Sequence, residues 1–495
     1  MFFLAFSHLK QFLFLVLLMS YKFQNFLLII MLVFCPSAVT SNEVLVGGSH
    51  THQKSEKRLG FQHESPVLSY EEKLDFKVGQ AIFEKIWVFA PSSTTASDGL
   101  GPLYNARSCS RCHKGNGRGI IEIEKSSSPS LFLRLSIPPT TKRHHQQLTS
   151  GKIGFIPEPT YGNQLQTFAY PGGRAEGTLK VKYTEISVEL SDKEEIKLQQ
   201  PFYTISDLGY GSLDKSFMFS PRIAPQMIGL GLLEAIDELD LLALADPDDL
   251  NKDGISGKVN IVWNEVANNN SIGRFGWKAG SPTLEQQNNA ALNGDIGISS
   301  WMFSDHAGDC TQMQSACQQQ THGNKRRDKP GVNMLEAPKT MTDLLLHYTR
   351  FIALPAARNT KETKRQKGQK IFKQAGCQKC HHAKFITAKN TEHDSLASQT
   401  IWPYTDLLLH DMGKGLADNR QEFLANGQEW RTPPLWGIGL TKLVSGDEFY
   451  LHDGRARTLL EAILWHGGEA ESSKQEVINL NNAQRQQLIY FLESL

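Results

Sequence analysis

The sequence predicts a mainly α-helical fold built from two related domains, the first of which carries an insertion of β-strands. Three observations lead to this prediction. The motif Cys-x-x-Cys-His occurs twice, at 109–113 and at 377–381. Short segments beside the two motifs resemble each other and follow the same order in both halves. Runs in which apolar and polar residues alternate fall between about residues 120 and 215, and this period of two is typical of strands.

Each motif has the spacing of a covalent c-type haem attachment site. The two thiols add to the haem vinyl groups, and the histidine that follows supplies an imidazole to the iron. A zinc site or a redox-active dithiol shares the Cys-x-x-Cys core. However, each copy has its own histidine, and neither has a second pair of zinc-type ligands nearby. We therefore expect two covalent haem c groups, held by Cys109, Cys112, His113, Cys377, Cys380 and His381.

The similar segments predict a duplicated, cytochrome c-like helical domain around each haem. The pairs are 79–83 with 368–372, 222–231 with 431–439, and 283–285 with 458–461. Within the insertion, strands are expected at 131–135, 179–183 and 186–190, with Pro and Gly marking the turns. A helix is expected over 340–357. The expected divisions are 1–41 as a signal peptide or anchor, 42–70 as a mobile linker, 71–335 as the first domain with its insertion, and 336–495 as the second domain.

The N-terminus predicts export from the cytoplasm. An apolar run at 26–35 follows Lys22 and precedes the small residues Ser37, Ala38 and Ser41, as in secretory signals. An uncleaved membrane anchor and a translation start at Met19 are the alternatives. A cleaved signal peptide and an uncleaved anchor both place the rest of the chain outside the cytoplasm. We expect the periplasm, where haem c is assembled and disulfides persist.

Composition limits the partners and indicates a disulfide. The net charge is +1, which gives no electrostatic reason to expect a nucleic-acid partner. Four of the seven cysteines belong to the two motifs and Cys35 lies in the leader, which leaves Cys310 and Cys317. We expect these two to form a disulfide, with two free thiols as the alternative.

Residues 249–257 resemble a calcium-binding loop. Oxygen-bearing side chains alternate at Asp249, Asn251 and Asp253, and Gly254 stands where such a loop turns sharply. Asn260 occupies the place of the usual bidentate Glu. The sequence therefore predicts a calcium ion at this loop, with an Asp/Asn/Gly turn without an ion as the alternative.

Further motifs resemble the di-haem oxidoreductase family, whose members are often labelled thiol oxidoreductase or di-haem peroxidase. The resemblance covers most of the chain from about residue 79 onward. This family is related to the bacterial di-haem cytochrome c peroxidases and to the methylamine-utilisation di-haem enzyme. The segments that carry the resemblance are 101–109, 273–279, 404–413, 431–436 and 451–456.

The resemblance implies a peroxide-reducing enzyme. In the peroxidases, peroxide reacts at the N-terminal haem, and electrons from a small cytochrome or copper protein arrive through the C-terminal haem. Trp277 stands where those enzymes have a tryptophan between the haems, and Asp295 lies near their distal acid, which is a Glu. His466 stands where the second haem's distal Met is found, which implies bis-His ligation and a lower potential. Met412 is the competing sixth ligand.

Plainer interpretations remain open for these residues. Trp277 can be a packing aromatic, Asp295 a turn acid, and Met227 a core residue rather than a haem ligand. His410 and His452 are expected to be hydrogen-bonded structural residues. Two alternative functions are an electron-transfer cytochrome with two six-coordinate irons and an oxidase of a protein or thiol substrate.

Two covalent haems are the first testable prediction. The mature protein should exceed the mass of its polypeptide by two haem groups, because each Cys-x-x-Cys-His motif forms two thioether bonds. Replacing Cys109 and Cys112 together by Ala should remove one haem in mass spectrometry. A preparation that carries a single haem and remains fully active would contradict the two-haem prediction.

Overall fold

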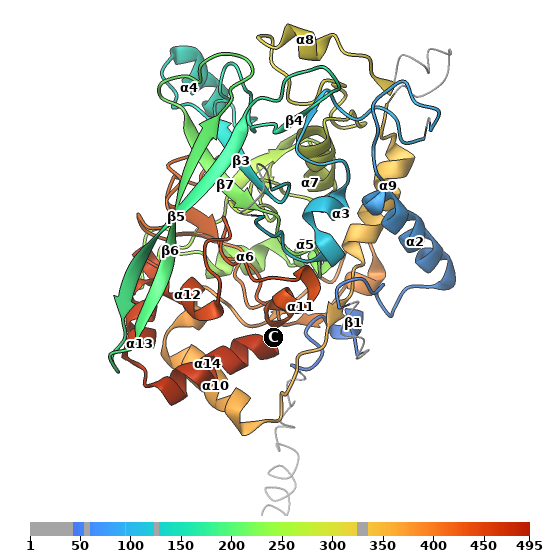
Figure 1. Cartoon of the computed structure of the whole chain (residues 1–495). Helices are drawn as coiled ribbons and strands as arrows, with labels where there is room; N and C mark the ends of the chain where they lie inside the picture. The colour runs from blue at the N-terminus through green and yellow to red at the C-terminus, as the bar shows by residue number, and fades with distance from the viewer. Residues whose placement is uncertain (1–42, 54–59, 95, 123–127, 324–334) are drawn as a thin grey trace, which may run out of the picture. The chain divides into compact units, whose positions relative to one another are not determined.

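The computed structural model describes residues 43–53, 60–94, 96–122, 128–323 and 335–495 (Figure 1). The helices of these residues are α2 (Tyr70–Glu84), α3 (Cys109–Cys112), α4 (Lys142–Thr149), α5 (Leu230–Glu234), α6 (Glu238–Leu244), α7 (Leu284–Ala291), α8 (Ser315–Gln318), α9 (Lys339–Arg350), α10 (Thr363–Gln374), α11 (Thr441–Ser445), α12 (Leu459–Leu464), α13 (Glu471–Asn479) and α14 (Asn482–Ser494).

The strands form two-stranded sheets only, within the described residues. They are β1 (Thr51–His52), β2 (Leu103–Tyr104), β3 (Leu131–Ser136), β4 (Phe168–Ala169), β5 (Thr178–Glu189), β6 (Glu195–Ser206), β7 (Met218–Ile223), β8 (Ile261–Asn264), β9 (Asn269–Ile272), β10 (Leu354–Pro355), β11 (Phe385–Ile386), β12 (Thr400–Ile401), β13 (Leu409–Asp411) and β14 (Glu429–Arg431).

The helix that precedes each Cys-x-x-Cys-His motif packs on a helix from later in the chain. Helix α2 packs on α9, and α10 packs on α14 (Figure 1). A glycine lies at each crossing. A Cβ atom on Gly79 would lie 2.2 Å from the carbonyl oxygen of Leu344, and one on Gly368 would lie 1.9 Å from that of Gln487. The glycines let the helix backbones touch, so the similarity of 79–83 to 368–372 corresponds to a shared mode of helix packing.

The capping residues explain where these helices begin. Ser69 and Glu72 form a reciprocal capping box at the start of α2, and Asn481 and Gln484 form one at the start of α14. Each box satisfies main-chain N–H groups that the first turn of a helix leaves without partners. The helix expected over 340–357 is α9, which ends earlier than expected, at Arg350.

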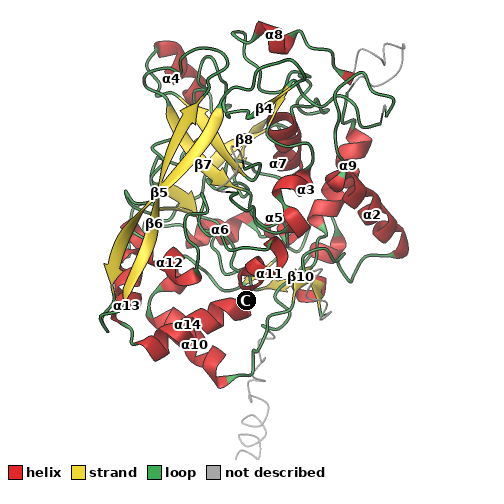
Figure 2. Ribbon diagram, in the orientation of Figure 1, coloured by secondary structure: helices red, strands yellow, loops and turns green. Residues whose placement is uncertain are grey.

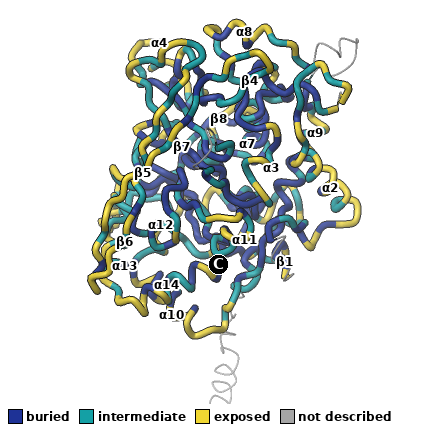
Figure 3. The backbone as a smooth tube through the Cα atoms, in the orientation of Figure 1, coloured by how far each residue is buried: buried dark blue, intermediate teal, exposed yellow. Residues whose placement is uncertain are grey.

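The insertion contains strands where they were expected, but 179–183 and 186–190 fall largely in one strand, β5, and the strands do not form one sheet. Strand β3 pairs with β7, and β5 pairs with β6 in a hairpin that joins Thr178 to Ser206 at one end and Glu189 to Glu195 at the other. The hairpin runs along one side of the protein, and much of it is exposed (Figure 3). Strand β2 pairs with β4 in a third small sheet.

The prediction of a mainly α fold is wrong. Helix accounts for 31% of the described residues and strand for 19%, in many small sheets (Figure 2). Strands also occur outside the insertion, in the pairs β8–β9, β11–β12 and β13–β14. These strands have two to four residues, which is too short for a period of two to be visible in a sequence. The similar segments 79–83 and 368–372 both lie in helices, α2 and α10, whereas 222–231 and 431–439 begin in strands, β7 and β14.

The segment 42–70, expected to be a mobile linker, is packed against the rest of the protein where the structure describes it. Val46 and Phe61 are buried in the main hydrophobic cluster. His50 is also buried; it bonds to Ser395 O at 2.7 Å and to the hydroxyl of Ser65 at 2.8 Å. Strand β1 pairs in parallel with β10, a partner that no local pattern in the sequence indicates.

Residues Glu43–Leu495 form one compact unit. Its main hydrophobic cluster draws side chains from both halves of the sequence, and the division at residue 335 stays a prediction. None of the helices in the described ranges has the length and apolar character needed to span a bilayer. The proposed leader, 1–41, lies outside the described residues.

The glycine at the α10–α14 crossing gives a stability prediction. Gly368→Ala should lower the free energy of unfolding by roughly 1–3 kcal/mol, because the added methyl group overlaps the backbone of α14. Gly415→Ala is the matched control, since its Cβ would lie 3.6 Å from Trp465, an ordinary contact. Denaturant titration measures both. Equal stability of the two variants would show that α10 and α14 do not pack as described.

Candidate functional site

Each Cys-x-x-Cys-His motif opens into its own cavity. The first cavity, of about 460 Å³, is lined by Cys109, Cys112 and His113 together with many residues of the first half. The second cavity, of about 170 Å³, is lined by the motif at 377–381 and by residues of α12 and α14. Both cavities are in the compact unit, and each has the motif in its wall.

The motif histidines are oriented in the same way. His113 Nδ1 lies 2.7 Å from Pro225 O, and His381 Nδ1 lies 3.0 Å from Tyr404 O. A carbonyl only accepts, so each Nδ1–H donates and each Nε2 is left as the unprotonated nitrogen. This is how proteins fix an imidazole for metal ligation. Phe83 and Phe372, from the repeated segments, lie 6.2 and 6.3 Å from the two imidazoles, measured between ring centroids.

Burial favours the neutral forms of the motif side chains. It lowers the pKa of His113 and lowers the pKa of His381 to about 4, so both imidazoles are neutral, as a metal ligand must be. Burial also raises the pKa of Cys109 and of Cys377 to about 12. A redox-active dithiol needs a lowered thiol pKa instead. The cysteines therefore fit covalent haem attachment better than they fit a reactive dithiol.

The two cavities share one wall. Arg118, Trp277, Arg431 and Pro433 line both of them. The Trp277 indole N–H donates to Ile223 O at 2.8 Å, and the Arg118 guanidinium lies 5.3 Å from the Trp277 ring centroid. The structure thus places Trp277 between the cavities, as the resemblance implied, while a role in electron transfer stays a prediction.

The arginines of the shared wall suit the acid groups of a haem. Arg118 and Arg431 are buried and donate to main-chain carbonyls, and neither forms an ion pair within the described part of the chain. Buried cations without a carboxylate partner are rare because desolvation is costly. A haem brings two carboxylates, so these arginines fit the group that the motifs imply.

Two candidates for a sixth ligand line the second cavity. His466 follows α12, and its Nδ1 donates to Ala462 O at 2.7 Å, which leaves Nε2 free. Met412 lines the same cavity. The structure brings both residues to the cavity of His381, and bis-His ligation stays a prediction. Met227 lines the first cavity and is packed in the core.

Asp295 lies in the wall of the first cavity, in a short π-helical segment, Leu292–Ile296. Gln164 Nε2 donates to Asp295 Oδ1 at 2.8 Å. Gln164 is held in turn by Asp309, whose Oδ2 accepts from the Gln164 main-chain N–H at 3.0 Å. Burial raises the pKa of Asp309 to about 7. A chain of hydrogen bonds therefore fixes one oxygen of Asp295, and no pattern in the sequence indicated it.

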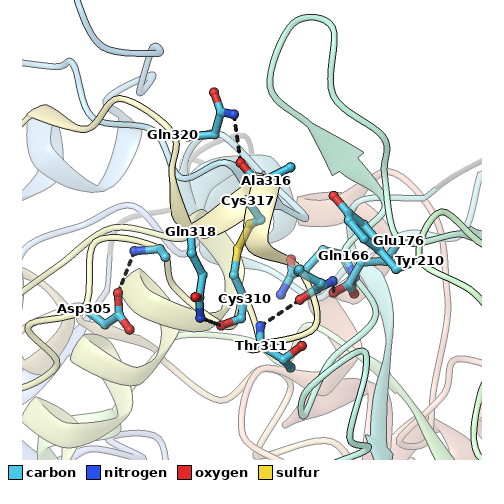
Figure 4. The surroundings of a disulfide bond; sticks show 12 residues. Gln166, Glu176, Tyr210, Asp305, Cys310, Thr311, Ala316, Cys317, Gln318 and Gln320 are labelled. Carbon is cyan, nitrogen blue, oxygen red and sulfur yellow. Dashed lines mark hydrogen bonds between the residues drawn. A yellow bond between two sulfur atoms is a disulfide. The ribbon is translucent and has the colours of Figure 1, made fainter.

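The expected disulfide between Cys310 and Cys317 is present, directly after Asp309 (Figure 4). Hydrogen bonds brace the loop that it closes. Thr311 N donates to Gln314 Oε1 at 2.8 Å, and Gln314 Nε2 donates to Glu176 Oε1 at 2.6 Å. Both cysteines are buried, so the disulfide holds the loop and is not exposed to a protein substrate.

His410 and His452 are buried in the wall of the second cavity. His410 bonds to Asp406 at 2.9 Å and to Glu469 at 2.7 Å. Burial lowers the pKa of His410, but these carboxylates raise it more, and the net pKa is well above its ordinary value. His452 stacks on Trp430 with a centroid distance of 3.7 Å, and burial lowers its pKa to about 4. His410 therefore has the hydrogen-bonded structural role expected from the sequence, whereas His452 is held by stacking.

One group of potential metal ligands in the described residues comprises Cys380, Asp406 and His410, with ligand atoms within 4.8 Å of one another. Both His410 nitrogens are already hydrogen-bonded to carboxylates, and Cys380 belongs to the second motif. This group therefore supports the haem-binding segment and does not offer an open metal site.

Side chains of the loop that resembles a calcium-binding loop, 249–257, form hydrogen bonds within the loop itself. Asp249 Oδ1 and Asn251 Oδ1 each accept from Asp253 N at 2.9 Å, and Asp253 Oδ2 lies 3.1 Å from Lys379 Nζ. These bonds are those of Asx turns, the alternative interpretation of the loop. The ion pair ties the loop to the second motif. Calcium at this loop stays a prediction.

Two cavities with a shared wall, each with an oriented neutral imidazole, fit a protein that binds two haem groups. A family model described as "Di-haem oxidoreductase, putative peroxidase" matches residues 40–495. The chain belongs to this di-haem oxidoreductase family, as the sequence motifs indicated.

Other comparisons add little. No curated protein matches the sequence. A solved structure of Kuenenia stuttgartiensis hydrazine synthase, pressurized with 20 bar xenon, is 21% identical and covers 32% of this chain and 55% of its own, with a TM-score of 0.21. The match thus spans about half the length of that chain, and a score this low carries no argument about fold or function.

Calcium removal tests the loop at 249–254. Chelation should lower the melting temperature, because an ion that binds only the folded state stabilises it. Asp249→Asn with Asp253→Asn should abolish this response to the chelator. If elemental analysis of undialysed protein finds no metal besides iron, the prediction of a calcium ion at this loop is wrong.

Proposed function

We propose that this protein is an exported di-haem enzyme that reduces peroxide with electrons from a small redox protein. Reduction of peroxide takes up two electrons and two protons and yields two waters. Haem iron, when bound, supplies the one-electron chemistry and the position at which peroxide reacts. The remaining requirements are a proton donor, a route for electrons and protection from bulk water, and these are tasks for the protein.

The observation that carries the proposal is the different surroundings of the two motif histidines. The second cavity contains His466 and Met412, either of which would serve as a second protein ligand for a haem held at His381. The first cavity contains no second histidine among its described lining residues. Its described lining includes Met227, which is packed in the main hydrophobic cluster, and Asp295. One site thus suits electron storage with a filled coordination sphere, and the other suits a reaction that needs an acid and an open position.

Asp295 is the proposed proton donor. Gln164 occupies its Oδ1, so Oδ2 is the oxygen left to carry and release a proton. Heterolysis of an O–O bond requires a proton on the leaving oxygen, and a positioned acid contributes about 10²- to 10⁴-fold to such steps. The hydrogen bonds through Gln164 to Asp309 hold the carboxyl in place during this transfer.

Electrons pass from the second site to the first across the shared wall in this proposal. Trp277 fills that wall and contacts both cavities. A small cytochrome or copper protein is the proposed donor at the second site. The periplasm is the proposed location, since the two attachment motifs and the buried disulfide suit an oxidising compartment.

Substitution of Asp295 tests the proposed reaction. Asp295→Asn should lower peroxide turnover by about 10² or more, because the amide keeps a hydrogen-bond partner for Gln164 but donates no proton in catalysis. Steady-state kinetics with peroxide and a reduced donor measure the effect. Unchanged turnover would show that Asp295 is not the acid.

Trp277→Phe is the informative comparison. It keeps an aromatic ring in the shared wall but loses the indole and its bond to Ile223. Peroxide should still oxidise the first haem, whereas re-reduction through the second haem should be slower in stopped-flow spectra. If neither haem reacts with peroxide in any redox state, the protein is an electron carrier and not a peroxide-reducing enzyme.

A further inference from the structure

Cationic side chains outnumber carboxylates around the first cavity. Seven Arg and Lys residues line it, namely Arg118, Arg134, Lys152, Arg222, Arg274, Arg420 and Arg431. Three carboxylates line it, namely Glu265, Asp295 and Glu422. Peroxide is neutral at ordinary pH and gives no reason for this excess of positive charge.

Three of these cations form a group that we call the arginine cluster: Arg134 on β3, Arg222 on the neighbouring strand β7, and Arg420. One oxygen of Glu422 accepts from both Arg222 Nη2, at 2.6 Å, and Arg420 Nη1, at 2.7 Å. Arg134 Nη1 donates to the neutral side-chain oxygen of Asn163 at 2.8 Å. Two guanidiniums therefore share one carboxylate directly, and the third has a neutral partner.

Arg222 and Arg420 are buried, Arg134 is partly buried, and the cluster has hydrogen-bonding capacity left. The side chains of Arg222 and Arg420 are only 6% and 1% exposed. The Nε atom of Arg420 is buried and has no hydrogen-bond partner. Burial lowers the pKa of Arg420 to about 10, and Glu422 and Asp418 oppose this effect, so the guanidinium is still charged at neutral pH. Buried cations in excess of their counter-ions favour binding of an anion.

We propose that the arginine cluster binds a carboxylate in the first cavity. The planar guanidinium presents parallel N–H donors that match the two oxygens of a carboxylate. The carboxylate comes either from the haem held by the first motif or from a small organic acid. The second source rests on the proposed function and deepens it, because the substrate would then carry an acid group.

Acetate binding tests the proposal without peroxide. The haem-loaded protein is titrated with sodium acetate at constant ionic strength, and binding is followed by calorimetry and by the Soret band. Arg134→Gln and Arg420→Gln should each weaken binding by tenfold or more. Arg143→Gln, which removes an exposed charge on α4, should leave it unchanged. Since Arg134 is only partly buried, its variant keeps the test available if the Arg420 variant does not fold.

Glu422→Gln separates anion binding from a structural role. Removing this carboxylate frees Arg222 and Arg420 from their shared partner, so acetate should bind several-fold more tightly. If Glu422 only holds the arginines in place, Glu422→Gln should instead weaken acetate binding, because the arginines lose the partner that orients them.

The two sources of the carboxylate give different results. If it is a free acid, acetate binds the haem-loaded protein. If it belongs to the haem, acetate binds only after Cys109→Ala with Cys112→Ala has removed the first haem. The absorbance of the second haem then shows whether this variant is folded. Absence of binding to both forms, or binding that ignores Arg134 and Arg420, would overturn the proposal. Because no step consumes peroxide, this outcome is independent of the peroxidase test.

Discussion

Both candidate haem sites depend on one hydrogen bond at their Cys-x-x-Cys-His motif, from a histidine Nδ1–H to a main-chain carbonyl. These bonds link His113 to Pro225 and His381 to Tyr404. Each bond fixes the tautomer and directs Nε2 as a ligand. The acceptors lie 112 and 23 residues away from their histidines. The loops that carry them must therefore fold against the motif before the ligand is oriented, which links formation of the fold to formation of the site.

The shared wall turns two haem sites into one functional unit. Trp277, Arg118 and Arg431 each line both cavities, so the two sites have these side chains in common. The two sites nevertheless differ chemically. His466 and Met412 line the second cavity, whereas Asp295, the arginine cluster and the core methionine Met227 line the first. Such asymmetry is what an enzyme needs if it stores electrons at one iron and uses them at another.

The sequence predicted those features that depend on residues close together in the chain. The two motifs, the disulfide of Cys310 with Cys317, and helix α9 could all be predicted from spacing and periodicity. It did not predict contacts between residues that are far apart in the chain. The Glu422 carboxylate lies 200 residues from Arg222, and no short pattern joins them. The mainly α prediction was wrong because strands of two to four residues leave no periodic signal, and the packed segment after residue 42 has a polar composition that resembles a linker.

The central claim is that the two haem sites are unequal, with an open iron position in the first and a protein ligand on each face of the second. Electron paramagnetic resonance of the oxidised protein tests this most directly, because it distinguishes high-spin from low-spin ferric haem. The account predicts one high-spin signal that His113→Ala alters and one low-spin signal that His466→Ala or Met412→Ala alters. Two low-spin signals in the unmodified protein, each unaffected by added peroxide, would contradict it.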